Sequence, residues 1–151
     1  MPKRQLSQKE IKDVNDSAKG FAMEIYKKDR IELLEEKHKI IFINGEAALF
    51  YYEGSLLPTL KLLQKNNALK TVTVDMGAVR FVVNGADIMR PGIRLCEPGI
   101  KKDDFVSIVD ETHKKPLAIG IAMFSGEEIM AQKGGKAVKN LHWVGDEIWN
   151  Y

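Results

Sequence analysis

The second half of the sequence is cut into short apolar runs, and this limits the folds open to the chain. From residue 71 onward, β-prone runs such as 71–74, 105–111 and 115–124 are separated by loops rich in glycine, proline, aspartate and lysine. Short strands at such spacing favour a compact barrel or sandwich over a parallel sheet. We therefore expect an α+β chain whose C-terminal part is a small β-barrel.

The N-terminal part carries a helix signal followed by a hairpin signal. Ser7 and Glu10 have the spacing of a capping box, and apolar residues follow at helical intervals. This pattern predicts a helix that Gly20 ends or bends. The Asn-Gly pair at 44–45 lies between two β-prone runs and predicts a hairpin, because both residue types accept positive φ.

Further short elements are predicted by local signals. Pro58 fits the first turn of a helix over residues 56–67. Ser125 is placed to cap a helical turn, and residues 134–142 are compatible with the start of another short helix. A last β-prone piece covers residues 146–151.

Composition and charge indicate an ordinary globular protein. The chain has 151 residues, of which 44% are hydrophobic and 29% are charged. No apolar run approaches the length of a membrane span, and no apolar stretch of a secretory signal follows the basic start. The single cysteine, Cys96, predicts a reducing, cytoplasmic setting. Residues 71–151 carry 10 basic and 11 acidic side chains, so anion binding there requires a local patch.

No arrangement typical of catalysis is found in the sequence. The histidines, His38, His113 and His142, lie on different segments and lack the spacing of zinc ligands. Cys96 has no neighbouring base, and the glycine-bearing loops match neither common nucleotide-binding pattern. We expect no enzyme activity, no metal and no cofactor.

The glycine-rich segment DMGAVRFVVNGADIMRPGI, residues 75–93, is the strongest candidate for a binding surface. We predict a tight turn at Gly77 and Ala78 leading into a short helix, with free N–H groups facing outward and Arg80 exposed. Residues 79 and 81–83 are predicted to form the buried side of this helix. Glycine lets a nucleic-acid backbone lie close to the protein backbone, and guanidinium groups grip phosphate. The alternative is that these glycines only form turns.

The C-terminal segment also combines glycines with basic residues. Lys133, Lys136 and Lys139 stand three apart, which on a helix places them near one face. The aromatic residues Trp143, Trp149 and Tyr151 are interpreted first as core or lid residues and only second as platforms for base stacking.

Three ordered blocks resemble the PUA domain, the RNA-binding module shared by pseudouridine synthases and archaeosine transglycosylases. They are VDMGAVRFVVNGADIMRPGI, IAMFSGEEI and GGKAVKNLHWVGDEIW. The upstream run HKIIFINGEAALFYYEGSLLPTLKLLQK resembles the pre-PUA domain of the malignant T-cell-amplified translation-factor family. The resemblance implies a pre-PUA α+β domain at 1–70 packed on a PUA pseudobarrel at 71–151, as in an archaeal-type stand-alone member.

The resemblance also implies a site and partners. Structured RNA is expected to contact the glycine turn, the segment after it and the GGKAV block. The RNA-binding residues that the resemblance implies are Gly77, Ala78, Arg80, Asn84, Gly85, Arg90, Gly92, Arg94, Lys133 and Lys136. The expected partners are transfer RNA, ribosomal RNA, the small ribosomal subunit and a separate protein with an initiation-factor-1-like domain. DNA and membranes are not expected as partners.

Two non-catalytic functions remain open at this point. The first is an RNA-binding protein that acts in translation. The second is an accessory module that delivers RNA to a separate enzyme that modifies transfer or ribosomal RNA.

Overall fold

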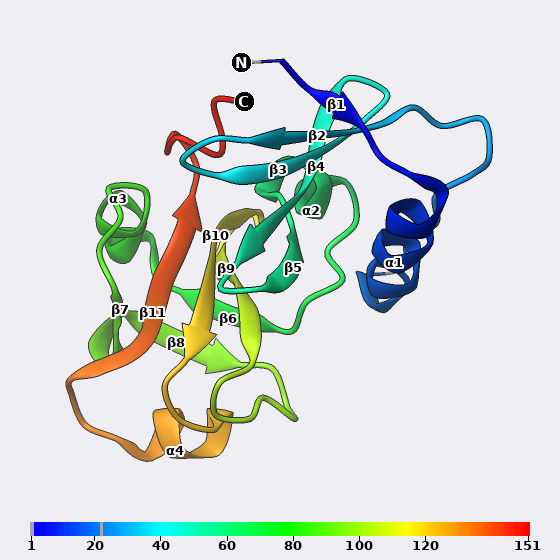
Figure 1. Cartoon of the computed structure of the whole chain (residues 1–151). Coiled ribbons are helices and arrows are strands. Elements are labelled where there is room, and N and C mark those ends of the chain that lie inside the picture. The colour runs from blue at the N-terminus through cyan, green and yellow to red at the C-terminus, as the bar shows by residue number, and fades with distance from the viewer. Residues whose placement is uncertain (1, 22) are drawn as a thin grey trace. The chain divides into compact units, whose positions relative to one another are not determined.

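The computed structural model describes residues 2–21 and 23–151, which form two compact units (Figure 1). The first unit runs to Ala68 and includes Tyr151, and the second unit is Leu69–Asn150. Both units combine helices with a sheet, which confirms the expected α+β class. No helix within the described ranges is both long and apolar enough to cross a bilayer.

The first unit is built on a five-stranded antiparallel sheet with the sequential order β1-β2-β3-β4-β5. One long helix, a short one and a 3₁₀ turn accompany it. The strands are β1 (Arg4–Gln5), β2 (Ile31–Glu35), β3 (Lys39–Ile43), β4 (Glu46–Tyr52) and β5 (Ser55–Pro58), and the helices are α1 (Gln8–Ala18), η1 (Lys19–Phe21) and α2 (Leu60–Lys65).

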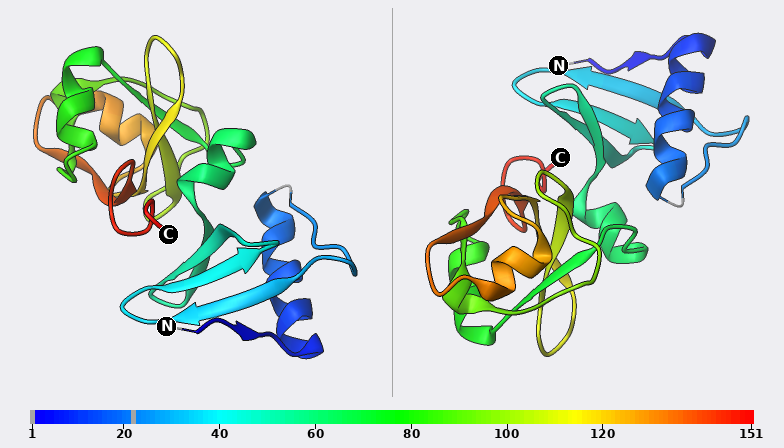
Figure 2. Two further views of the ribbon diagram at one scale, coloured as in Figure 1. Left: turned by 90° about the horizontal axis from the view of Figure 1, so that it is seen from above. Right: turned by 90° about the horizontal axis from the view of Figure 1, so that it is seen from below.

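Helix α1 forms where the sequence predicts it. Ser7 accepts a hydrogen bond from the Glu10 N–H, and the Glu10 carboxylate accepts one from the Ser7 N–H, so the capping box is complete. Val14 and Ala18 are buried against the sheet, and α1 lies along one sheet face in both views of Figure 2. The α-helix ends at Ala18 and passes into the 3₁₀ turn that contains Gly20.

The predicted hairpin is also confirmed, whereas the role of Pro58 is not. Asn44 and Gly45 connect β3 to β4 with φ values of 51° and 86°. Pro58 is the last residue of β5 and does not lie in a helical turn. Helix α2 instead begins after Thr59, whose hydroxyl accepts a hydrogen bond from the Leu62 N–H.

The second unit is built on a six-stranded sheet with the order β7-β11-β10-β9-β6-β8. All its neighbouring strands are antiparallel except β6 and β9, which are parallel. The strands are β6 (Thr71–Val74), β7 (Ile88–Met89), β8 (Ile93–Cys96), β9 (Phe105–Asp110), β10 (Pro116–Ala122) and β11 (Lys136–Trp143). The helical segments are η2 (Met76–Ala78), α3 (Val79–Val82), η3 (Arg90–Gly92) and α4 (Gly126–Ala131).

The sheet of the second unit curves around an aliphatic core. Val72, Ile108, Ala118 and Val138 are fully buried within it. The register between β10 and β11 shifts at Gly120, where an added Cβ would meet the Val138 side chain at 2.5 Å and the Lys139 carbonyl at 2.6 Å. Glycine therefore allows the two strands to approach closely at this bulge.

Two elements near the C-terminus differ from the prediction. The segment that includes residues 136–142 is strand β11, because it pairs with β10 on one side and β7 on the other. Residues 146–150 form turns around Asp146, whose carboxylate accepts hydrogen bonds from the N–H groups of Trp143 and Trp149. The cap at Ser125 is confirmed, and Glu128 completes a second capping box at α4.

Candidate nucleic-acid interface

The second unit contains an apolar groove of about 470 Å³ beside α3, which we call the α3 groove. Three segments of the chain line it: η2 with α3, the loop before β7 with β7 itself, and η3. Its lining residues are Asp75, Gly77, Ala78, Phe81, Val82, Ala86, Asp87, Ile88, Met89, Pro91 and Gly92. The groove thus gathers Gly77, Ala78 and Gly92 from the predicted site.

The turn at the start of the groove is closed by its own carboxylate. The Asp75 side chain accepts a hydrogen bond of 2.9 Å from the Ala78 N–H. The prediction that free N–H groups would face outward here is therefore wrong for Ala78. The following helix α3 has only four residues, so few aligned N–H groups and a small dipole lie at its N-terminus.

Phe81 lies on the open side of α3, contrary to prediction. Its side chain is 55% exposed, whereas Val82 is buried in the core. Successive residues of a helix are rotated by about 100°, so residues 81, 82 and 83 cannot all face inward. The Arg80 guanidinium carbon lies 4.8 Å from the centre of the Phe81 ring. An exposed aromatic ring therefore lies beside an exposed cation at the groove.

Gly92 allows two segments to meet at the bottom of the groove. A Cβ at position 92 would lie 3.1 Å from the Ala78 Cβ, a tighter contact than side chains usually accept. The Gly92 carbonyl accepts a hydrogen bond of 2.9 Å from the Asp75 N–H. This glycine is therefore needed for packing within the protein.

Asn84 and Gly85 form the turn that follows α3. The Asn84 side-chain amide donates to the Arg80 carbonyl at 2.6 Å, and Gly85 has a φ of +89°. The Trp143 ring lies directly against Gly85 and packs on the core, so the structure supports the core interpretation of Trp143. Asn140 supports the turn by donating to the carbonyls of Val82 and Ala86, a role that sequence reasoning missed.

The predicted cationic side chains differ in whether they already form hydrogen bonds or ion pairs within the protein. The Arg90 guanidinium donates to the carbonyls of Ile93 and Met130 at 2.9 and 3.2 Å. These bonds disfavour Arg90 as a contact for a ligand. Lys136 is exposed and lies 3.3 Å from Asp87, a residue of the α3 groove.

Two other predicted residues lie outside the groove lining. Arg94 is exposed on β8 and pairs with Glu111 at 3.1 Å. Lys133 is exposed in the turn between α4 and β11. Neither is among the residues that line the α3 groove.

The residue types that could support catalysis are dispersed. Cys96 is buried, and burial raises the pKa of its thiol despite the opposing charge of Arg90. His142 is fully buried and its Nδ1 lies 2.8 and 3.0 Å from the two Asp146 oxygens. Across residues 2–21 and 23–151, no cluster of three or more histidine, cysteine or acidic side chains is suited to hold a metal ion.

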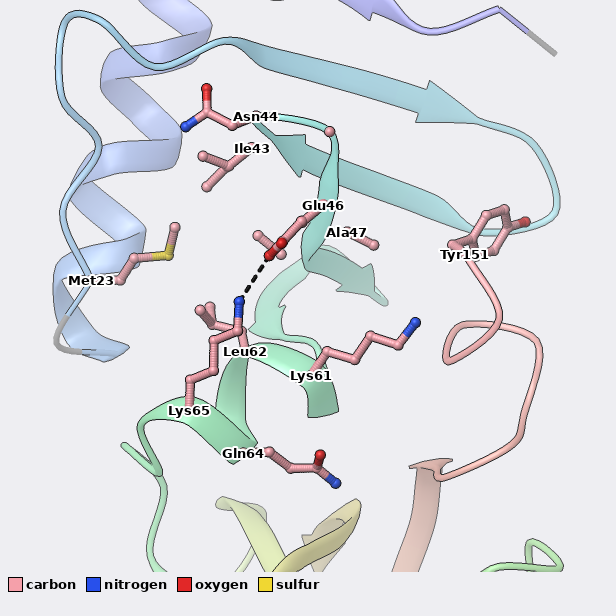
Figure 3. A pocket seen from close by; sticks show the side chains of 12 residues that line it. Met23, Ile43, Asn44, Glu46, Ala47, Lys61, Leu62, Gln64, Lys65 and Tyr151 are labelled. Atoms are coloured by element: carbon pink, nitrogen blue, oxygen red, sulfur yellow. Dashed lines mark hydrogen bonds and ion pairs between the residues drawn. The ribbon is translucent and has the colours of Figure 1, made fainter.

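The first unit has a larger and more polar cavity of about 800 Å³ (Figure 3). Lys65 and Glu46 face each other across it at 2.8 Å, and Met23 and Leu62 contribute apolar lining. Both partners of the ion pair are more than 60% exposed, so solvent screens the pair and it contributes little to stability.

Two family models match the chain. The model described as PUA domain matches residues 70–144. The model described as Domain of unknown function (DUF1947) matches residues 3–66.

Relatives from archaea and eukaryotes align with most of the chain. An uncharacterized protein of Methanocaldococcus jannaschii is 42% identical, with 97% of this chain and 94% of that protein aligned. Translation machinery-associated protein 20 of Saccharomyces cerevisiae is 38% identical, with 84% and 75% aligned. Malignant T-cell-amplified sequence 1 of Rattus norvegicus is 36% identical, with 82% and 72% aligned.

Solved structures share the fold. A hypothetical protein from Pyrococcus horikoshii superimposes with a TM-score of 0.84 at 34% identity, covering 99% of this chain and 98% of that one. A chain in a Cbf5-Nop10-Gar1 complex has a TM-score of 0.52 at 30% identity, covering 62% of this chain and 27% of that one. The chain therefore belongs to the PUA-domain family that includes Translation machinery-associated protein 20 and Malignant T-cell-amplified sequence 1.

Proposed function

We propose that this protein is a non-catalytic RNA-binding component of the translation machinery, and that its second unit contacts structured RNA at the α3 groove. The observation that carries the proposal is the membership of a family in which the fungal relatives are named for association with that machinery. The proposed RNA is transfer RNA or the ribosomal RNA of the small subunit.

The chemistry of the groove supports RNA as the ligand. Phe81 and Met89 are exposed apolar side chains at a concave surface, and such surfaces usually mark a binding site. An unpaired base can lie against them, while Arg80 meets an adjacent phosphate with two donors in a fixed fork. Lys136, beside Asp87, provides a second cation for the phosphate backbone of the RNA.

Of the remaining predicted residues, Gly77, Ala78 and Gly92 are proposed to shape the backbone surface that RNA approaches. Asn84 and Gly85 are proposed to act by fixing the end of α3. Arg94 and Lys133 stay as proposed outer contacts. The structural role of Arg90 makes it the least suitable of the set for testing binding.

A non-catalytic role agrees with the chemistry of the potential nucleophile and bases. Cys96 is buried with a raised pKa, and His142 is held by Asp146 inside the second unit. We further propose a cytoplasmic location, with the small ribosomal subunit and a separate initiation-factor-1-like protein as partners.

The alternative proposal is an accessory role in RNA modification. It is favoured by the likeness of this chain, over 62% of its length, to a chain of a Cbf5-Nop10-Gar1 complex. Cosedimentation separates the two proposals: translation predicts that the protein travels with small ribosomal subunits, and the accessory role predicts that it travels with a modification enzyme.

Binding of a folded transfer RNA transcript to the full chain tests the surface. We expect Arg80→Glu to weaken binding about tenfold, because a charge-assisted hydrogen bond is worth about 1.5–3 kcal/mol and every 1.4 kcal/mol is tenfold. Phe81→Ala is expected to weaken it as well. Lys102→Glu and Leu95→Ala are matched controls, since both residues are exposed and, unlike Arg80 beside Phe81, neither is next in sequence to a residue that lines the groove. Equal affinity of Arg80→Glu, Phe81→Ala and the controls would exclude this surface.

A further inference from the structure

The first unit presents an exposed aromatic residue at the tip of a turn. Tyr26 is 56% exposed, and among the described residues only Phe81 is another aromatic residue exposed for more than half of its surface. Lys27 and Lys28 follow it directly, and the three side chains line a shallow hollow of about 360 Å³.

Hydrogen bonds hold the turn at both ends. The Tyr26 carbonyl accepts a hydrogen bond of 2.9 Å from the Asp29 N–H. In return, the Tyr26 N–H donates to the Asp29 carboxylate at 2.8 Å, and the Asn44 amide donates to the other Asp29 oxygen at 3.0 Å. The turn is thus tied to the β3–β4 hairpin, and a ligand that binds it would pay little entropy for ordering the loop.

The charges around the tip favour an anion. The Asp29 carboxylate faces back into the turn, and its hydrogen bonds from Tyr26 and Asn44, with a smaller contribution from the charge of Lys28, hold its pKa below the usual value. Neither Lys27 nor Lys28 has an ion-pair partner within 4.0 Å among the residues that the structure describes. Glu24 is exposed two residues before Tyr26.

We infer that the Tyr26–Asp29 turn is a second RNA contact, at which an unpaired base stacks on the Tyr26 ring and the flanking phosphates meet Lys27 and Lys28. This inference rests on the proposed function, that the chain binds RNA, and extends the contact to the first unit. A flat exposed ring with adjacent cations suits any base, because every base has a π-face. An acidic peptide would gain less here, since the hollow is shallow and offers one ring as its apolar surface.

The test uses the full chain and a fluorescein-labelled decamer of oligouridine, with binding followed by anisotropy at low salt. Tyr26→Ala should weaken binding at least about fivefold, because stacking of one base is worth about 1–3 kcal/mol. Tyr26→Phe keeps the ring and should bind within about twofold of the parent. The melting temperature should not change in either variant, because the side chain is exposed.

The lysines are tested by the salt dependence of the same binding. Replacing Lys27 and Lys28 together by alanine should reduce the slope of log affinity against log salt by about 1.4, since each neutralised phosphate of a single strand contributes about 0.7. Replacing Lys9 and Lys12, two exposed lysines of α1, removes the same charge and should leave the slope unchanged.

The outcomes separate this inference from the proposed function. If Tyr26→Ala binds the decamer as well as the parent while Arg80→Glu loses affinity, the inference fails and the proposed function stands. If only the Tyr26 and lysine variants lose affinity, the inference stands and the α3 groove fails. No binding of RNA by the parent chain would overturn both, and tighter binding of polyglutamate than of RNA at the lysines would overturn the inference.

Discussion

At the scale of single residues, Gly85 shows how one missing side chain fixes a turn beside the proposed site. Its φ is +89°, and a Cβ there would lie 2.6 Å from the Trp143 ring. The ring is partly buried and packs on the core of the second unit. The turn after α3 is therefore compatible with glycine and with few other residues.

We predict that Gly85→Ala lowers the free energy of unfolding by about 2 kcal/mol or more, because it adds backbone strain to a steric clash. Urea denaturation of the full chain measures the change. Gly134→Ala is the matched control, since a Cβ there meets nothing within 4 Å and the residue has no positive φ. Similar destabilisation in both variants would contradict the steric explanation.

The buried pair of His142 and Asp146 makes stability depend on pH. Burial alone would raise the pKa of Asp146, but the hydrogen bonds from His142, Trp149 and Trp143 outweigh it and leave that pKa below the usual value. A carboxyl group with a lowered pKa in the folded state stabilises the protein above the unfolded pKa of about 3.9. That contribution is lost as the pH falls through the folded pKa.

We therefore predict that Asp146→Asn lowers stability at neutral pH by about 2 kcal/mol, through the loss of charge-assisted hydrogen bonds. The variant should also lose less stability than the parent between pH 5 and 3, a range set by that unfolded pKa of about 3.9. Unfolding curves across that range measure both effects. Asp13→Asn, at an exposed position of α1, is the control. Parallel acid limbs for Asp146→Asn and the parent would refute the assignment.

At the scale of elements, helix α1 depends on its cap. The helix buries Val14 and Ala18 against the sheet, and its first turn is closed by Ser7 and Glu10. We predict that Ser7→Ala costs about 1 kcal/mol of stability in urea denaturation, because an N–H of the first turn loses its acceptor. Ser17→Ala, in the same helix at an exposed position, should be neutral or slightly stabilising, since alanine has the higher helix propensity. A loss of the same size at both positions would argue against the cap.

Elements with strong local signals could be predicted from sequence, and those without them could not. The box at Ser7, the pair Asn44-Gly45 and the cap at Ser125 each specify a local structure through hydrogen bonds within a few residues. Strand β11 has no such signal, and its strand state comes from pairing with β10 and β7, which are distant in sequence. Pro58 satisfied the rule for a helix start and still ended a strand, because Thr59 provides the better cap.

At the scale of the whole molecule, charge limits how RNA can be held. The net charge is +2, and residues 69–150 contain 11 basic and 11 acidic side chains. A broad electrostatic field is therefore absent from the second unit, and binding has to rely on a few local contacts.

We predict a moderate salt dependence for transfer RNA, with a slope of log affinity against log salt between about −2 and −4. This range corresponds to two to four neutralised phosphates. Filter binding between 50 and 200 mM salt measures the slope. A slope near −8 would require many more cations than the two proposed contacts offer, and would contradict this arrangement.

The amino-acid sequence by itself determined the α+β class, the family and the region of the glycine turns, because ordered motifs and turn residues act over short distances. Only the tertiary structure decided which side chains are open to a ligand. Arg90 is bonded to carbonyls 3 and 40 residues away, whereas Phe81 was predicted to be buried and lies open at the α3 groove. Exposure depends on which distant segments pack against a residue, and no local pattern in the sequence contains that information.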